Sequence, residues 1–230
     1  MAKSVAAVLF ALSLAALEPV ASGALGLGVG CSLALETVDV GGNFSGVSTD
    51  ARLDTFPIGV KLFLDAKYLE ASAGWLLAGN GNVTVGVGGY YAQGTLGQTL
   101  SYLTFAAYLK YPFNFRTSEI FPLLGLEYRL NIAALDSAGN DVTPGLTTQQ
   151  RADLNELWFQ AGGGMDFFFG NLSIRSELIL GLKFLSPTDQ DGLIALQGAG
   201  YSSPSKSYFT INLDLLLGWT LVNERLSNER

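Results

Sequence analysis

Histidine is absent from the 230-residue sequence, and cysteine occurs only once, as Cys31. Without histidine, the chain lacks Ser–His and Cys–His catalytic pairs and metal sites with histidine ligands. A single cysteine excludes an intramolecular disulfide framework. Charged residues make up 14% of the chain, whereas ordinary soluble domains contain about 25%. We therefore expect a non-enzymatic protein that uses no cofactor and no metal.

Basic residues and long apolar runs are also scarce. The chain has 13 Lys and Arg against 20 Asp and Glu, for a net charge of −7, and nucleic acid is excluded as a partner because its phosphates need a basic surface. No apolar run reaches the ~18 residues of a membrane-spanning helix. The run Val5–Leu17 follows Lys3 and precedes the small residues Ala21–Gly23. This order predicts a secretory signal peptide over residues 1–23.

Period-two alternation, by contrast, is abundant. In FTINLDLLLGWTL, residues 209–221, every second side chain is large and apolar, which indicates a β-strand with two unlike faces. The same alternation recurs in residues 24–36, 55–64, 67–78, 100–113, 120–134, 155–169 and 172–185.

The connections between these eight segments alternate in length. The short ones are Asp65-Ala66, Asn114–Glu119 and Gly170-Asn171, and the long polar ones are 37–54, 79–99, 135–154 and 186–206. Within the second long one, residues 82–93 themselves alternate and predict a projecting hairpin. An even strand number with short turns on one side is typical of membrane barrels. We predict an all-β fold, an eight-stranded antiparallel up-and-down transmembrane β-barrel over residues 24–222, followed by a polar C-terminal tail over 223–230.

The two faces of the predicted strands differ in charge. One face is apolar, and the other carries five positive and five negative residues: Lys61, Glu70, Lys110, Glu127, Arg129, Asp166, Arg175, Glu177, Lys183 and Asp214. Glycine on the charged face leaves room for long side chains in a narrow barrel. Balanced charge is what a low-dielectric interior requires. We therefore expect the apolar face to meet lipid and the charged face to line the lumen.

The short turns predict two cross-strand ion pairs. If Asp65-Ala66 closes a two-residue hairpin, Lys61 lies directly opposite Glu70. If Gly170-Asn171 does the same, Asp166 lies opposite Arg175. Directly opposed side chains on one face are within contact range.

Aromatic side chains gather near the strand ends, where membrane barrels carry two girdles at the lipid–water interfaces. The predicted interface aromatics are Trp75, Tyr111, Phe113, Phe121, Phe167, Phe169 and Trp219.

In this architecture the chain resembles the small eight-stranded outer-membrane barrels, the group of OmpX, the OmpA transmembrane domain and OmpW. The resemblance covers residues 24–222 and rests on strand pattern, with no short motif. It implies the outer membrane of a diderm bacterium, with outer-membrane lipid as surroundings and periplasmic chaperones and the barrel assembly machinery as partners during biogenesis. Such barrels usually end on an aromatic residue, whereas here Trp219 is followed by a polar tail.

Three functions fit this pattern. The first is a non-enzymatic barrel with a lumen largely filled by side chains, whose four long loops serve envelope stability or contact a partner that the sequence does not name. The second is an OmpW-like narrow channel for small, hydrophobic solutes. The third is a soluble exported barrel that holds an apolar ligand. The interior of an eight-stranded barrel is just wide enough for side chains to fill, which favours the first.

Overall fold

The structure is a computed structural model that describes residues 25–115 and 117–222. The predicted signal peptide and polar tail lie outside the described residues. The elements in chain order are β1 (Leu25–Phe44), β2 (Val47–Thr55), β3 (Ile58–Ala66), β4 (Leu69–Ala78), β5 (Gly81–Val87), β6 (Tyr90–Leu96), β7 (Thr99–Lys110), β8 (Phe113–Asn114), β9 (Ser118–Leu135), η2 (Thr143–Gly145), α2 (Thr148–Asp153), β10 (Glu156–Phe169), β11 (Leu172–Lys183), α3 (Pro187–Gly198) and β12 (Tyr201–Val222).

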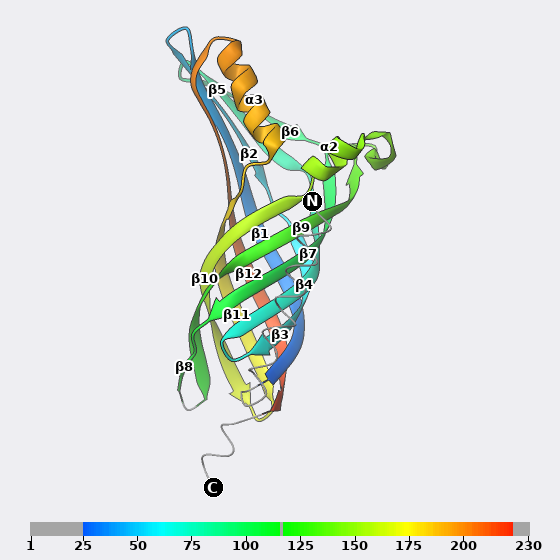
Figure 1. Ribbon diagram of the computed structural model, residues 1–230, viewed down its shortest axis with the longest axis vertical. Helices are drawn as coiled ribbons and strands as arrows, with labels where there is room; N and C mark the ends of the chain where they lie inside the picture. The colour runs from blue at the N-terminus through cyan, green and yellow to red at the C-terminus, as the bar shows by residue number, and fades with distance from the viewer. Residues whose placement is uncertain (1–24, 116, 223–230) are drawn as a thin grey trace.

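Eight long strands close into one antiparallel barrel (Figure 1). Each strand pairs with the next in the order β1, β3, β4, β7, β9, β10, β11 and β12, and β12 pairs back with β1. The predicted eight-stranded up-and-down barrel is therefore confirmed. None of the helices within residues 25–115 and 117–222 has the length and apolar character needed to cross a membrane.

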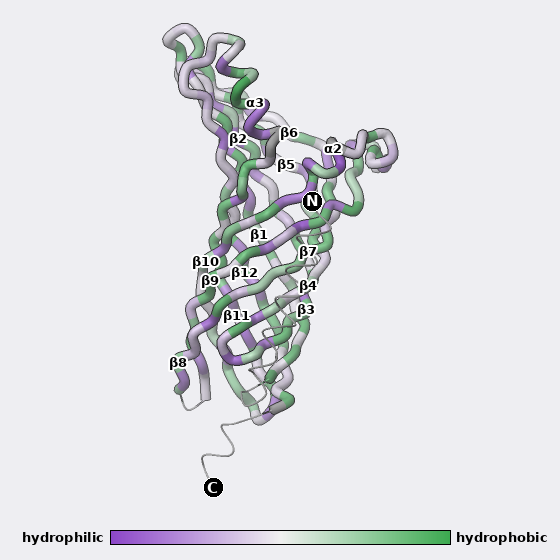
Figure 2. Tube along the Cα trace, viewed as in Figure 1, coloured by the Kyte–Doolittle hydropathy of each residue, from purple (hydrophilic) through white to green (hydrophobic). Residues whose placement is uncertain are grey.

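The outer surface of the barrel is apolar and its interior is charged. In β11, Leu178 is 54% exposed, whereas its neighbour Glu177 is 1% exposed, because successive side chains of a strand point to opposite faces. Figure 2 shows hydrophobic and hydrophilic residues alternating along the barrel strands. The third alternative, a soluble barrel, does not fit this arrangement, because such a protein would bury the apolar face.

One side of the wall continues beyond the barrel as a sheet. β1 pairs with β3 as far as Leu33↔Ile58, and from Glu36↔Thr55 onward it pairs with β2. β2 pairs with β5 and β5 with β6, so β12, β1, β2, β5 and β6 form a five-stranded extension. In Figure 1 this extension rises at the upper left, with α3 alongside it.

Two stretches predicted as loops contribute strands to this extension. The polar stretch 37–54 is not a loop, because it completes β1 and forms β2 around a turn at Ser45-Gly46, both with positive φ. Residues 82–93 form the predicted hairpin, in which β5 and β6 meet at Gly88-Gly89.

The polarity of the two faces reverses where the extension begins. Outward residues of β1 are apolar up to Leu35, and the next ones are Thr37 and Asp39. Inward residues change in the opposite sense, from Glu36 to Val38. A lipid-facing band must be apolar and a water-facing surface need not be, so the wall leaves the membrane at this height.

The turn between β3 and β4 lies two residues later than predicted. Ala66 pairs with Leu69, and Lys67, with a φ of 57°, begins the turn. The prediction of a turn at Asp65-Ala66 is therefore wrong. The sequence pattern could not exclude it, because both turns leave the same residues on the inner face. The observed pairing differs from the predicted one by four residues, since Lys61 lies opposite Gly74. A shift by an even number of residues preserves the period-two pattern, whereas a slip of one reverses it. The Gly170-Asn171 turn lies where the sequence places it, with Phe169 opposite Leu172.

Candidate functional site

Charged side chains fill the lumen in three clusters. The lower cluster, nearest the short turns, comprises Arg175, Lys110, Asp65, Asp166 and Glu119. The middle cluster comprises Lys61, Glu70, Glu177 and Asp214. The upper cluster, below the long loops, comprises Arg129, Lys183, Glu36, Glu127 and Glu156. All ten residues assigned to the lumen from the sequence lie in these clusters.

Arg175 of β11 organises the lower cluster. Its Nε and Nη2 donate to the two carboxylate oxygens of Asp166 at 2.8 and 2.6 Å, and Asp166 is the residue directly opposite in β10. Arg175 also donates to Asp65 and, from Nη1, to Glu70 at 2.5 Å. Its guanidinium lies over the ring of Phe63, 4.6 Å from the centroid. A bidentate, buried contact of this kind fixes both position and orientation.

Lys61 of β3 is the cation of the middle cluster. Its Nζ lies 2.7 Å from Asp214, 3.0 Å from Glu177 and 3.8 Å from Glu70. Lys61 is opposite Gly74 rather than Glu70, so the predicted direct opposition is wrong, and Asp65 occupies that place. The contact with Glu70 is therefore the longest of the three.

Arg129 of β9 holds the upper cluster together. It donates to Glu36 and to Glu127, and its Nη1 lies 3.6 Å from Glu156. Glu156 also contacts Lys183 at 3.2 Å. The Arg129 guanidinium lies over the ring of Trp158, which is 1% exposed. The upper cluster therefore joins β1, β9, β10 and β11 across the lumen.

The lumen is not charge-balanced, contrary to the prediction. Its five cations face nine carboxylates, because Glu36, Asp65, Glu119 and Glu156 also point inward. Each of these four lies near the end of a strand predicted from the sequence or in a predicted turn. Glu156 and Asp166 have the same parity in β10, so the alternation itself contained the missing signal.

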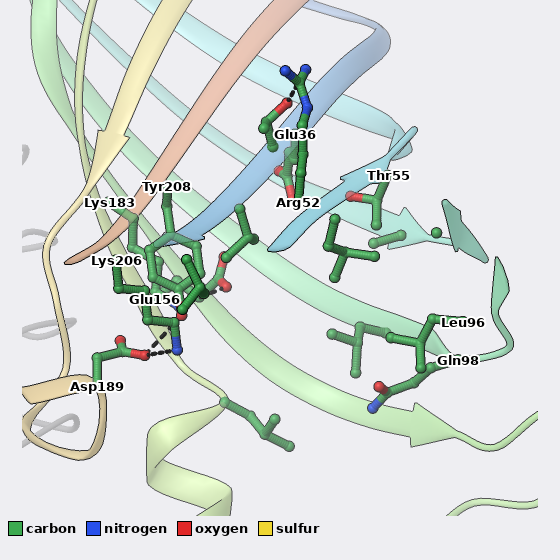
Figure 3. A pocket seen from close by; sticks show the side chains of 18 of the residues that line it. Glu36, Arg52, Thr55, Leu96, Gln98, Glu156, Lys183, Asp189, Lys206 and Tyr208 are labelled. Carbon is green, nitrogen blue, oxygen red and sulfur yellow. Dashed lines mark hydrogen bonds and ion pairs between the residues drawn. The ribbon is translucent and has the colours of Figure 1, made fainter. Parts of the chain in front are cut away.

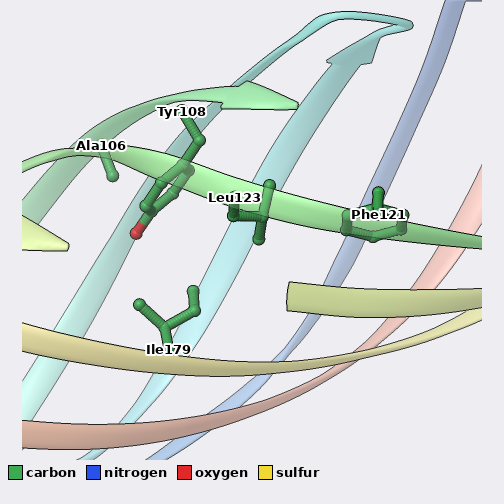
Figure 4. Packing of buried hydrophobic residues seen from close by; sticks show 5 residues of the cluster. All are labelled: Ala106, Tyr108, Phe121, Leu123 and Ile179. Atoms are coloured by element: carbon green, nitrogen blue, oxygen red, sulfur yellow. The ribbon is translucent and has the colours of Figure 1, made fainter. Parts of the chain in front are cut away.

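Apolar side chains complete the packing between the charged clusters. Tyr108, Phe121, Leu123 and Ile179, from three strands, are at most 3% exposed (Figure 4). The Tyr108 hydroxyl donates to Gln160. A cavity between Lys61 and Arg129 has a volume of about 20 Å³, which is room for about one water. Side chains therefore close the barrel at mid-height.

Phe121 belongs to this interior, so its prediction as an interface aromatic is wrong. It is 0% exposed, and the cations of Lys110 and Arg175 lie 4.2 and 4.9 Å from its ring centroid. The other aromatics predicted at the interfaces are exposed: Trp75, Tyr111, Phe113, Phe167, Phe169 and Trp219.

Above the upper cluster a cavity of about 480 Å³ opens among the loops (Figure 3). One wall is apolar and comes from the extension, with Val38, Leu53, Val83 and Leu96. The cavity is also lined by charged and polar side chains: Glu156, Lys183, Asp189, Lys206 and Tyr208. The cavity is therefore amphipathic and ends on the sealed lumen.

Asp189 anchors α3 at the rim of this cavity. Its carboxylate accepts from Lys206 Nζ at 2.5 Å and from the Tyr208 hydroxyl at 2.8 Å. It also accepts from the backbone N–H of Ser186, whose hydroxyl accepts from the Asp189 N–H, so the two form a capping box. Burial disfavours its ionisation, but the hydrogen bonds from Lys206, Tyr208 and Ser186 outweigh burial and hold the pKa of Asp189 well below its usual value.

Asp189→Asn should loosen α3 and leave the barrel intact. Asparagine loses the charge-assisted contact with Lys206, so backbone amides of α3 are expected to exchange hydrogen several-fold faster. Because the pKa is lowered by folding, the contribution of Asp189 is present above 3.8 and is lost as pH falls further. Wild-type α3 should therefore stay protected between about pH 5 and 8 and lose protection in stronger acid. Asp191→Asn, on the same helix at an exposed position, is the control. Equal exchange in both variants would contradict the anchor.

The wall, the outer surface and the interior of the barrel together indicate the class of protein. A closed antiparallel wall, an apolar outer band and a charged, packed interior occur together in one kind of protein. The chain has the architecture of a small outer-membrane β-barrel.

Comparisons with known proteins found similar solved structures but no matching family model. No family model matches the chain, and no curated protein matches it significantly. Among solved structures, neisserial surface protein A is 12% identical, with 87% of this chain and 100% of that chain covered and a TM-score of 0.47. The outer-membrane protease OmpT of Escherichia coli is 6% identical, with 87% and 98% covered and a TM-score of 0.43. The outer-membrane protein OprG of Pseudomonas aeruginosa is 12% identical, with 87% and 97% covered and a TM-score of 0.38. At these scores the likeness carries no functional argument.

Proposed function

We propose that this barrel is a non-enzymatic protein of the outer membrane of a diderm bacterium, delivered there by its N-terminal signal peptide. The sealed barrel serves as a rigid anchor. The extension and the long loops are the parts that act, either in envelope stability or in contact with a partner outside the cell. Binding residues commonly lie on loops that a rigid scaffold positions.

The observation that supports this proposal is the filled lumen. Three charged clusters and the apolar residues between them close the barrel, and Glu70, Gln160 and Phe121 are each 0% exposed. The mid-lumen cavity holds about one water. A hydrated ion or a small solute has no path of its own size at this height.

The cavity above the upper cluster supports a second candidate, a narrow channel for small amphipathic or hydrophobic solutes. Its apolar and charged side chains would suit such a molecule at the entrance. For this function the packed residues below it have to move, which makes conduction the property that separates the two candidates.

The test is single-channel conductance of the refolded barrel in a planar bilayer. We expect wild-type protein, shown to be folded by heat-modifiable migration in gels, to give no discrete current steps. The double variant Tyr108→Ala/Ile179→Ala removes two side chains that fill the lumen and serves as the positive control. It should give small steps. Steps of constant size from the wild type would contradict the sealed anchor and support the channel.

A further inference from the structure

Buried carboxylate oxygens without a hydrogen-bond donor remain in the lumen. Within the described part of the chain they are Asp65 Oδ1, Glu70 Oε1, Glu177 Oε1 and Asp214 Oδ1. The side chains of Glu70 and Glu177 are both 0% exposed. Buried acceptors left without a donor destabilise a folded protein, so these two oxygens require an explanation.

Glu70 of β4 and Glu177 of β11 contact the same two cations in the lumen. Lys61 lies 3.8 Å from Glu70 Oε1 and 3.0 Å from Glu177 Oε2. Arg175 Nη1 lies 2.5 Å from Glu70 Oε2 and 3.6 Å from Glu177 Oε1. Two carboxylates are therefore held side by side between two shared cations.

Those two cations do not supply the missing donors. Lys61 donates its short hydrogen bonds to Glu177 Oε2 and Asp214, and Arg175 donates to Asp65, Asp166 and Glu70 Oε2. The groups facing Glu70 from all sides are Lys61 and Asp65 of β3, Tyr108 of β7, Asp166 of β10, Arg175 and Glu177 of β11, and Asp214 of β12. The lower and middle clusters together have three cations and six carboxylates, which leaves an excess of negative charge.

We propose that part of this excess is offset by a bound proton, held between Glu70 Oε1 and Glu177 Oε1. One of the two side chains is then a neutral carboxylic acid whose O–H donates to the carboxylate oxygen of the other. A single proton satisfies both oxygens and removes one negative charge from the buried interior. Within the described residues, no group of three or more acidic, cysteine or histidine side chains is arranged to hold a metal ion, so the proton is the ligand that fits.

The proton is part of the seal. With it, Glu70 and Glu177 attract each other and join β4 to β11 across the barrel. When it leaves at alkaline pH, the two carboxylates repel in the middle of the packed interior. Glu70→Gln should replace the proton permanently, because the amide Nε2 donates to Glu177 as the carboxylic O–H does.

The first experiment is infrared spectroscopy of the refolded, full-length barrel at neutral pH. A protonated carboxyl group absorbs above the amide I band and shifts when the buffer is changed to D₂O. We expect this band in the wild type and in the control Asp54→Asn, whose side chain pairs with Arg52 near the rim. We expect its loss in Glu70→Gln and in Glu177→Gln. A wild type without the band, or a band that persists in both glutamine variants, would overturn the proposal.

The second measurement is the dependence of heat-modifiable migration on pH. The wild type should lose thermal resistance as pH rises into the alkaline range, whereas Glu70→Gln should keep it. If wild-type resistance instead follows the sodium concentration at constant pH and ionic strength, a metal cation occupies the site and the proton assignment is wrong. Neither readout depends on whether the barrel conducts.

Discussion

Replacing Arg175 by alanine is expected to prevent stable folding of the barrel. The variant leaves Asp166, Asp65 and Glu70 without their shared guanidinium, in positions where Asp166 and Glu70 are at most 2% exposed. It also leaves a void between the rings of Phe63 and Phe121. Removing one partner of a buried ion pair costs about 3–5 kcal/mol, and here several contacts are lost together.

The temperature at which heat-modifiable migration is lost measures this effect. Arg175→Lys keeps the charge but loses the bidentate geometry with Asp166, so it should fall between alanine and wild type. Lys206→Ala removes a cation from the rim pair with Asp189, where the Lys206 side chain is 27% exposed, and should leave the barrel transition almost unchanged. A wild-type transition in Arg175→Ala would show that the lower cluster does not stabilise the barrel.

Gly30→Ala is expected to block closure of the barrel. Gly30 lies in β1 opposite Leu216 of β12, at the seam where the first and last strands meet. A Cβ atom there would overlap the carbonyl oxygen of Leu215 and lie 2.6 Å from the Cα of Leu216. Both obstacles are backbone atoms, so no side-chain movement relieves them, and the seam must separate locally.

Gly26→Ala is the matched control, since it adds the same methyl group to the same strand. There the Cβ would lie 3.6 Å from the nearest atom, the backbone oxygen of Trp219, which is an ordinary contact. After refolding into detergent or lipid, the folded fraction should drop severely for Gly30→Ala and remain near wild type for Gly26→Ala. Equal folded fractions would mean that the seam tolerates displacement of β12.

The barrel itself could be predicted from the sequence because its strands obey one rule throughout. Each strand alternates between lipid and lumen, so both strand number and face follow from period-two counting. Phe121 shows where the rule was not applied: it has the parity of Glu127 and Arg129 on β9, and counting alone would have placed it inside.

Register could not be predicted in the same way. The turns at Asp65-Ala66 and at Lys67-Tyr68 present identical faces, so no hydrophobic pattern distinguishes them. The two turns differ in the contacts that they allow between distant strands: in the observed register Asp65 pairs with Lys110 and Arg175. The charge excess, by contrast, could have been predicted, because Glu36 and Glu156 have the inward parity of their own strands.

The extension was hidden because its alternation changes sense at the membrane surface. Up to Leu35 the outward positions of β1 are apolar, and beyond it they are polar. A stretch rich in glycine, serine and aspartate then resembles a loop. Pairing with β2 and β12 supplies the backbone hydrogen bonds that make it a strand.

The two strands that form the seam are also the two that continue into the extension. β1 has 20 residues and β12 has 22, and their pairing runs from Leu25↔Val222 to Phe44↔Tyr201. The pairing of β12 with β1 therefore both closes the barrel wall and adds a strand to the projection. β2, β5 and β6 pair with one another and with β1 independently of β12, so an antibody would report completed barrels only if its epitope spans the paired β1 and β12 in the projection.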